Sequence, residues 1–176
     1  MISIIIPTYN EQESIATLVT FLRENSLAGK VEIIVCDAGS SDLTLESAAA
    51  AGAMAILSPR KGRAVQMNYG ASLAKGEILY FVHADTIPPV TFFLDITTAV
   101  AGGFGLGRYR TKFNSKKKVL KLNAFFTRFD LFMCYGGDQT LFIRKDLFTD
   151  IGGFYEALVI MEDYEIIKRA REKARY

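Results

Sequence analysis

The sequence predicts an α/β protein with a Rossmann-like, mainly parallel sheet that is flanked by helices. Short runs rich in β-branched residues alternate with longer segments whose apolar residues recur at helical spacing. Polar residues follow directly after several of these runs, as they do at the carboxyl edge of a parallel sheet. With 176 residues, half of them apolar, and no internal repeat, the chain is expected to form a single domain over 1–176.

The first half of the chain carries the clearest alternation. Strands are predicted at 2–6, 31–35, 53–57 and 78–82. Helices are predicted at 11–24, 41–51 and 63–75, and the first of them places Ile15, Leu18, Val19 and Leu22 on one face. Strands separated by helices favour parallel pairing.

The pattern changes after Pro88 and Pro89. A helix is predicted at 91–100, a strand at 105–110, a basic aromatic helix over 115–135, a last strand at 139–143 and a final helix that contains Ile166 and Ile167. No linker or boundary separates this part, so it is expected to complete the same domain.

Charge is nearly balanced over the chain but not along it. Lys and Arg number 21 against 19 Asp and Glu, which argues for neither a nucleic-acid nor a membrane partner. Between 103 and 129, however, there is no acidic residue and there are eight basic ones, which favours an anionic partner for this segment.

Cysteine usage and hydropathy indicate the compartment. Cys36 and Cys134 do not form a disulfide framework or a zinc site, so both are expected to be reduced, buried thiols. No basic leader and no run of roughly 18 apolar residues is present. The expected location is the cytoplasm, either free or peripheral at the inner face of the membrane.

The first predicted strand leads into Pro7, Thr8, Tyr9, Asn10 and Glu11. A nucleoside could stack on Tyr9 at this edge of the sheet. Alternatively, Thr8 or Asn10 caps the following helix and Tyr9 belongs to the core.

The second predicted strand leads into Asp37, a turn containing Gly39, and Ser40, Ser41 and Asp42. Helix capping accounts for the last three residues. Asp37 directly follows an apolar run and is expected to face the same crevice as Tyr9.

Two further segments add cationic and metal-ligating groups. Arg63 opens a predicted helix, where backbone N–H groups and a guanidinium suit a phosphate; the alternative is an ordinary solvated helix start. His83 and Asp85 stand two residues apart after an apolar run, and on a strand they would share a face and could hold one divalent ion.

Glu162 and Asp163 precede the last helix. Either acid can favour a helix N-terminus, and either can serve as a general base for an incoming hydroxyl.

Five motifs in order resemble those of family 2 glycosyltransferases, and the resemblance covers nearly the whole chain. They are Ser3 to Glu11, Asp37 to Asp42, Gly70 to Glu77, His83-Ala84-Asp85 and Glu162-Asp163. Arg63 to Asn68, Phe81 to Thr86 and Gly137-Asp138-Gln139 look like a small bacterial subgroup with a His-Ala-Asp version of the Asp-x-Asp motif. The resemblance implies a GT-A fold, a nucleotide-diphosphate sugar donor, Mg²⁺ or Mn²⁺, and hexosyltransferase-like transfer with inversion at the anomeric carbon.

The same resemblance implies roles for individual residues. Asp163 matches the catalytic base and Asp85 the metal-binding aspartate, while His83 replaces the first aspartate and binds either metal or ribose. The donor-binding set is Pro7, Thr8, Tyr9, Glu11, Asp37, Arg63, Ala84 and Asp85, and the acceptor-side set is Asp138, Gln139 and Glu162. Ala38 stands where many members carry an acid that reads uracil, which argues against a uridine donor.

Alternative functions stay open on these residues. A nucleotidyltransferase would carry a Gly-rich, Arg-containing loop after the first strand, which this chain lacks. His83, Ala38 and the end of the chain at Tyr176, where members usually continue with further elements, allow a catalytically impaired nucleotide-binding or scaffold protein. The absence of a Gln-x-x-Arg-Trp motif argues against a processive polysaccharide synthase.

The basic aromatic segment over 115–135 has an apolar stripe that includes Val119, Leu122 and Phe126. Core packing or a homodimer contact is one interpretation. The other is a membrane-surface helix that receives a lipid or lipid-phosphate acceptor.

Overall fold

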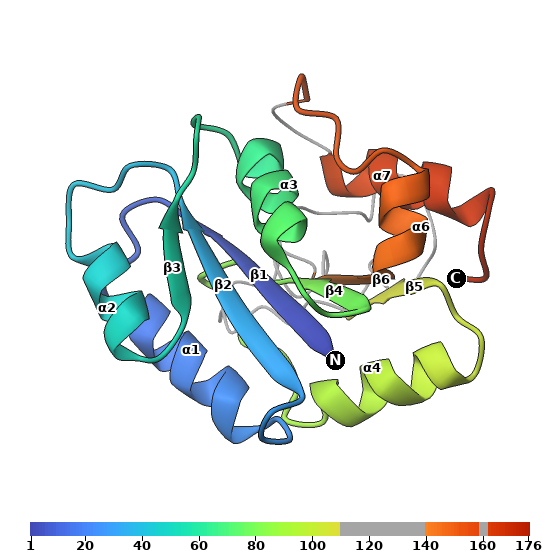
Figure 1. The fold of residues 1–176 in the computed structure, drawn as a ribbon, viewed down its shortest axis with the longest axis horizontal. Helices are drawn as coiled ribbons and strands as arrows, with labels where there is room; N and C mark the ends of the chain where they lie inside the picture. The colour runs from blue at the N-terminus through green and yellow to red at the C-terminus, as the bar shows by residue number, and fades with distance from the viewer. Residues whose placement is uncertain (110–139, 159–161) are drawn as a thin grey trace, which may run out of the picture.

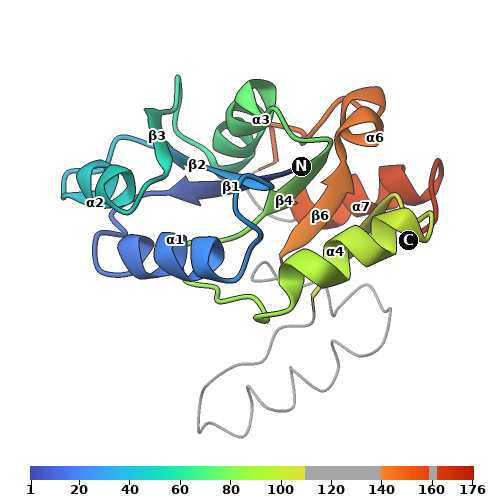
Figure 2. The ribbon, with the colours of Figure 1, turned by 60° about the horizontal axis from the view of Figure 1, so that its bottom comes forward.

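The computed structural model of the chain describes residues 1–109, 140–158 and 162–176. Within these ranges the molecule has three layers, with helices on both faces of a central sheet (Figures 1 and 2). The predicted basic aromatic helix over 115–135 lies outside the described residues, as do Asp138 and Gln139.

The sheet has six strands in the order β3-β2-β1-β4-β6-β5. Their bounds are β1 Ile2–Thr8, β2 Val31–Asp37, β3 Met54–Leu57, β4 Ile78–Phe81, β5 Leu106–Arg108 and β6 Leu141–Arg144. The first four strands pair in parallel, whereas β6 runs antiparallel to both β4 and β5. The predicted mainly parallel sheet is therefore confirmed, and the later strands extend the same sheet.

Six helices lie in the described residues, on the two faces of the sheet. They are α1 Ile15–Glu24, α2 Thr44–Ala50, α3 Arg63–Leu73, α4 Phe92–Ala101, α6 Lys145–Asp150 and α7 Glu162–Arg171. The two views show α1 and α4 on one face and α3 and α6 on the other.

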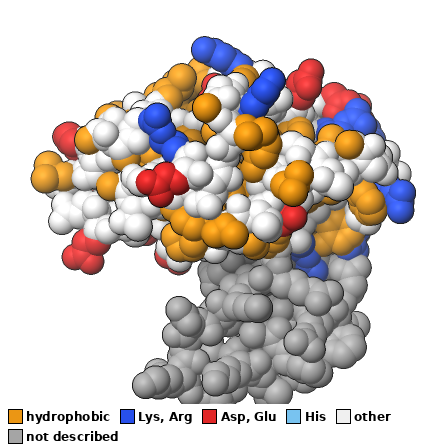
Figure 3. Space-filling model, turned by 90° about the horizontal axis from the view of Figure 1, so that it is seen from below, with side chains coloured by type: hydrophobic (Ala, Val, Ile, Leu, Met, Phe, Trp, Pro, Cys, Tyr) orange, Lys and Arg blue, Asp and Glu red, His pale blue; other side chains and the backbone are white. Residues whose placement is uncertain are grey.

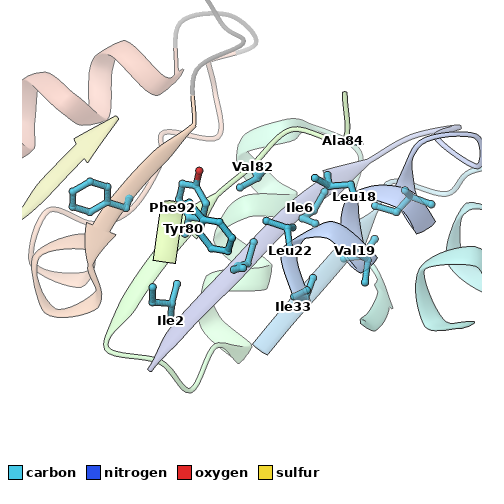
Figure 4. Close-up of a cluster of buried hydrophobic side chains, with 14 of the residues drawn as sticks. Ile2, Ile6, Leu18, Val19, Leu22, Ile33, Tyr80, Val82, Ala84 and Phe92 are labelled. Carbon is cyan, nitrogen blue, oxygen red and sulfur yellow. The ribbon is translucent and has the colours of Figure 1, made fainter. Parts of the chain in front are cut away.

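The alternation of side chains along the strands produces two apolar layers. Ile2, Ile4 and Ile6 point to the face where α1, α2 and α4 pack, together with Tyr80 and Phe92 (Figure 4). The rings of Tyr80 and Phe92 stack at 5.7 Å between centroids. This layer anchors α1 and α4 and so holds the carboxyl ends of β1 and β4 in place.

On the opposite face, Ile5, Leu79 and Phe81 contact α3, α6 and α7. Phe81 packs edge-on against Phe154 at 4.9 Å between ring centroids, within reach of α6. Because α7 carries Glu162 and Asp163, this second layer determines where these two acids lie.

Gly76 allows β4 to start close to β1. A Cβ on Gly76 would lie 2.6 Å from the Ser3 hydroxyl oxygen and 2.7 Å from the Met1 carbonyl oxygen, so any other residue clashes with the backbone. The Gly76 N–H instead donates to the Ser3 hydroxyl at 2.8 Å. This part of the Gly70 to Glu77 motif thus has a packing role.

Element boundaries differ from the predictions at functionally important points. Strands β1 and β2 extend to Thr8 and Asp37, whereas β4 ends at Phe81 and the helix predicted from residue 11 begins only at Ile15. The short helix α6 was not predicted.

Candidate active site at the carboxyl edge of the sheet

A pocket opens where β1 and β4, neighbours in the sheet, both end. It is lined by Pro7, Thr8, Tyr9, Glu11, Arg63, Gln66, His83, Ala84 and Asp85. Seven of the eight residues predicted to bind the donor are in this group, and His83 is there as well. The remaining one, Asp37, is fully buried beside it.

Asp37 organises the loop that follows β2. Its carboxylate accepts hydrogen bonds from the Thr8 hydroxyl at 2.9 Å, from the Gly39 and Ser40 N–H groups at 2.8 and 2.7 Å, and from the Ser40 hydroxyl at 2.5 Å. These bonds link the ends of β1 and β2 and stabilise the turn that follows. The carboxylate thus shapes the wall of the pocket, and a direct contact with a nucleoside stays a prediction.

Asn10 connects the loop after β1 to the loop after β2. Its backbone is left-handed, with φ of 56°, and its side-chain oxygen accepts a hydrogen bond from the Ser41 N–H at 2.9 Å. The Asn10 N–H donates to the Ser40 hydroxyl at 2.7 Å. The alternative prediction that Thr8 or Asn10 caps α1 is therefore wrong, because both side chains bind residues at the end of β2 or in the loop after it and α1 begins only at Ile15.

The same geometry corrects the capping interpretation of Ser40 and Ser41. Their polar groups bond to Asp37 and Asn10, and α2 begins only at Thr44. Asp42 does accept from the Thr44 N–H, at 3.0 Å.

Replacement of Asp37 by Ala is expected to lower the free energy of unfolding by about 2–4 kcal/mol, because the buried Thr8 hydroxyl and the partly buried donors of Gly39 and Ser40 lose their acceptor. Asp37→Asn keeps one oxygen and should cost only about 1 kcal/mol. Urea denaturation measures both values. Equal losses for the two variants would contradict this account, and a stable Asp37→Asn protein that no longer binds nucleotide would indicate direct contact.

Gln66 is a pocket residue to which sequence analysis assigned no role. Its amide nitrogen donates to the carbonyl oxygens of Thr8 and Cys36 at 2.8 and 2.6 Å, so it joins the ends of β1 and β2. The available signal was a polar residue on the otherwise apolar, buried face of α3 between Val65 and Met67.

His83 and Asp85 lie beyond the end of β4, in a turn, and not on the strand where they were predicted to share a face. Both still line the pocket. The Asp85 carboxylate accepts a hydrogen bond from the Thr86 hydroxyl at 3.2 Å. Across the described residues, no group of three or more His, Cys, Asp and Glu side chains is arranged to hold a metal by itself.

Both acids at the start of α7 contact groups that line the pocket. Glu162, only 2% exposed, pairs with the Arg63 guanidinium at 3.2 Å. The Asp163 carboxylate oxygen Oδ2 lies 3.7 Å from Nε2 of His83, with both side chains largely buried. The two residues are in the first turn of the helix, not before it as predicted.

The outer rim of the pocket is aromatic and basic. Tyr9 is 53% exposed, and the Lys61 ammonium lies 5.0 Å from the centroid of its ring. Glu11 accepts a hydrogen bond from the Ser14 hydroxyl at 2.9 Å. An exposed ring with a neighbouring cation suits a base carrying phosphates.

Other predictions concern the rest of the chain. Burial raises the pKa of the Cys36 thiol to about 12, as expected for an inert, reduced cysteine, whereas Cys134 lies outside the described residues. No helix among the described residues is long and apolar enough to cross a membrane.

Figure 3 shows hydrophobic side chains on the face where α1 and α4 lie. Ile87, Val90 and Leu94 are exposed in the segment that leads into α4 and along it.

The family comparison covers most of the chain: residues 3–147 match the sequence model described as Glycosyl transferase family 2. Among curated proteins, glucosyl-3-phosphoglycerate synthase of Mycolicibacterium smegmatis is 31% identical over 53% of this chain and 33% of its own length. Glycosyltransferase AglE of Haloferax volcanii is 27% identical over 97% of this chain and 61% of its own length. The chain thus spans between one third and three fifths of the curated relatives it matches.

Among solved structures, the mannosyltransferase PcManGT from Pyrobaculum calidifontis in complex with GDP-Man and Mn²⁺ superposes with a TM-score of 0.69 at 19% identity. The match covers 99% of this chain and 53% of the mannosyltransferase. This likeness confirms the predicted GT-A fold.

Proposed function

The chain belongs to glycosyl transferase family 2, and from this membership we propose that it transfers a sugar, with inversion, from a nucleotide-diphosphate donor to an acceptor hydroxyl. One observation carries the proposal. Seven residues predicted from sequence to bind the donor line one pocket, and the predicted base Asp163 contacts a residue of that pocket. Relatives of the chain that are named for glycosyl transfer support the same reaction class.

The donor would bind across the carboxyl ends of β1 and β4. Tyr9 would offer its exposed ring to the nucleobase, and Pro7, Thr8 and Glu11, which line the same pocket, would contact the nucleoside. Arg63, at the first position of α3, offsets charge on the diphosphate with the help of the free N–H groups of the helix end. Ala38 stands where many members of the family carry an acid that reads uracil, which argues against a uridine donor.

Asp85 is the residue of this chain that fits a divalent ion. Mg²⁺ and Mn²⁺ are commonly held by one or two carboxylates together with phosphate oxygens and water, so a cluster of three protein ligands is not required. Asp85 lines the donor pocket, and its one hydrogen bond among the described residues, from Thr86, leaves lone pairs for an ion. A bound ion would neutralise charge on the departing diphosphate.

Asp163 would act as the general base. The acceptor oxygen attacks the anomeric carbon, the bond from that carbon to the diphosphate oxygen breaks, and the electron pair leaves with the diphosphate. The hydroxyl proton passes to the Asp163 carboxylate. A single displacement of this kind inverts the anomeric configuration.

The acceptor is expected to approach from the side of α7. Glu162 lies there, buried against Arg63, and Asp138 and Gln139 stay predicted acceptor contacts outside the described residues. A lipid or lipid-phosphate acceptor, a peripheral membrane contact and a homodimer through 115–135 are also predictions that concern that part of the chain. A single domain over 1–176 is part of the same proposal.

A panel of nucleoside diphosphates, screened by thermal shift with Mn²⁺ and with excess chelator, tests the donor class. At a ligand concentration about 100 times Kd, binding adds about 2.7 kcal/mol to the free energy of unfolding, which raises Tm by roughly 5–10 °C for a chain of this size. We expect this shift with Mn²⁺ and a much smaller one with chelator, because the bare carboxylates repel the diphosphate. The base that gives the largest shift then selects the nucleotide sugars for turnover assays.

Turnover separates an enzyme from a binding protein. Release of nucleoside diphosphate from the selected donor, measured with Mn²⁺, supports the proposal. Binding without release, with every acceptor tried, would favour the scaffold alternative. Release at an equal rate in excess chelator would refute the role of Asp85.

A further inference from the structure

His83 faces Asp163 across 80 residues of sequence. Nε2 of the imidazole lies 3.7 Å from the carboxylate oxygen Oδ2, and the two side chains are 13% and 17% exposed. Largely excluded from water, a contact of this kind is stronger than one between exposed groups. The distance is longer than a hydrogen bond, as is common for catalytic pairs in unliganded structures, which tighten when substrate binds.

The surroundings of the pair restrict where the carboxylate can go. Glu162, the preceding residue, is buried and held by Arg63 at 3.2 Å. Ile166 and Ile167, one turn further along α7, are buried in the apolar layer against the sheet. The backbone of the first turn of α7 is thereby anchored on both sides, and among the described residues His83 contacts the Asp163 side chain from the pocket.

We propose that His83 is a positioning residue for the base, and not a ligand of the metal. By holding Oδ2 of Asp163, the imidazole directs the other carboxylate oxygen toward the acceptor hydroxyl, in the way that a third group orients the base of a catalytic triad. This inference rests on the proposed function.

Three substitutions separate positioning from metal binding. His83→Leu removes the contact and is expected to lower kcat by about 10- to 100-fold, since small misplacements of catalytic groups have effects of this size. KM for the donor and Mn²⁺ affinity should be unchanged. His83→Gln retains an N–H donor and should recover much of kcat.

His83→Asp is the decisive variant. Positioning predicts a kcat below that of His83→Leu, because like charges repel and displace Asp163. If His83 were a metal ligand, kcat of His83→Asp would instead be higher than that of His83→Leu, since a carboxylate is a better ligand for Mg²⁺ and Mn²⁺ than imidazole is. Loss of Mn²⁺ affinity in His83→Leu with recovery in His83→Asp would overturn the proposal. Val90→Ala, an exposed position on the same connection, is the control.

A second measurement does not depend on activity. His83 is the only histidine in the chain, so its imidazole resonances are assigned without ambiguity. At one fixed pH, Asp163→Asn should shift them, whereas Glu172→Gln, just beyond α7, should leave them in place. Unshifted resonances in Asp163→Asn would refute the contact. A wild-type protein that shows the contact but never turns over a donor would refute the proposed function and leave the pair intact.

Discussion

Replacement of Asp163 by Asn is expected to lower kcat by about 10²- to 10⁴-fold, the usual contribution of a positioned general base. Asn has nearly the same shape but cannot take the proton of the acceptor hydroxyl. Binding of nucleoside diphosphate with Mn²⁺ should be retained, because Asp163 is not among the residues that line the donor pocket.

Steady-state kinetics measures kcat, and calorimetry on the same preparation measures the affinity for nucleoside diphosphate. Glu172→Gln removes a carboxylate just beyond the same helix and serves as the matched control. A kcat close to that of the wild type would exclude Asp163 as the base, and a fall in nucleotide affinity together with kcat would place it in the donor site instead.

Much of the fold could be predicted because local patterns determine it. The β-branched runs and the helical spacing of Ile15, Leu18, Val19 and Leu22 identify the elements, and all four of these side chains are fully buried. The turn after β4 was harder to predict. The apolar run continues to Val82, and only the pairing of β4 with β1 and β6 shows that the ladder ends at Phe81.

The pocket residues were also accessible from sequence, since parallel strands bring their carboxyl ends together. The hydrogen-bond partners of these residues could not be predicted from sequence. A hydrogen bond joins Asn10 to Ser41, 31 positions further along the chain, and another joins Gln66 to Thr8, 58 positions away. No local sequence pattern specifies such distant pairs. Polar residues that were predicted to cap helices therefore connect two loops instead.

The pairs Arg63–Glu162 and His83–Asp163 belong to the same class of distant contacts. Arg63 was predicted to bind the donor and Glu162 to lie on the acceptor side. His83 was predicted to bind metal or ribose and Asp163 to be the base. The structure joins them, so the first turn of α7 contacts two residues that line the pocket, Arg63 and His83.

Asp85→Asn is expected to abolish the dependence of donor binding on Mn²⁺ and to reduce turnover by at least about 100-fold, because an ion at a diphosphate contributes several kcal/mol. The amide retains the size of the side chain and an oxygen that can accept from the Thr86 hydroxyl, so the fold should be unaffected. Neutral Asn binds a divalent cation more weakly than a carboxylate does.

The expected effects of Asp85→Asn on nucleotide binding and on kcat differ from those of every His83 variant. The two positions, only two residues apart, can therefore be compared directly. Asp85→Asn should lose the thermal shift given by nucleoside diphosphate with Mn²⁺, whereas His83→Leu should keep the shift and lose kcat. Glu13→Gln, an exposed acid outside the pocket, controls for the change in net charge. A full Mn²⁺-dependent shift in Asp85→Asn would mean that the ion is held elsewhere, and the assignment of the donor diphosphate to this end of β4 would then be wrong.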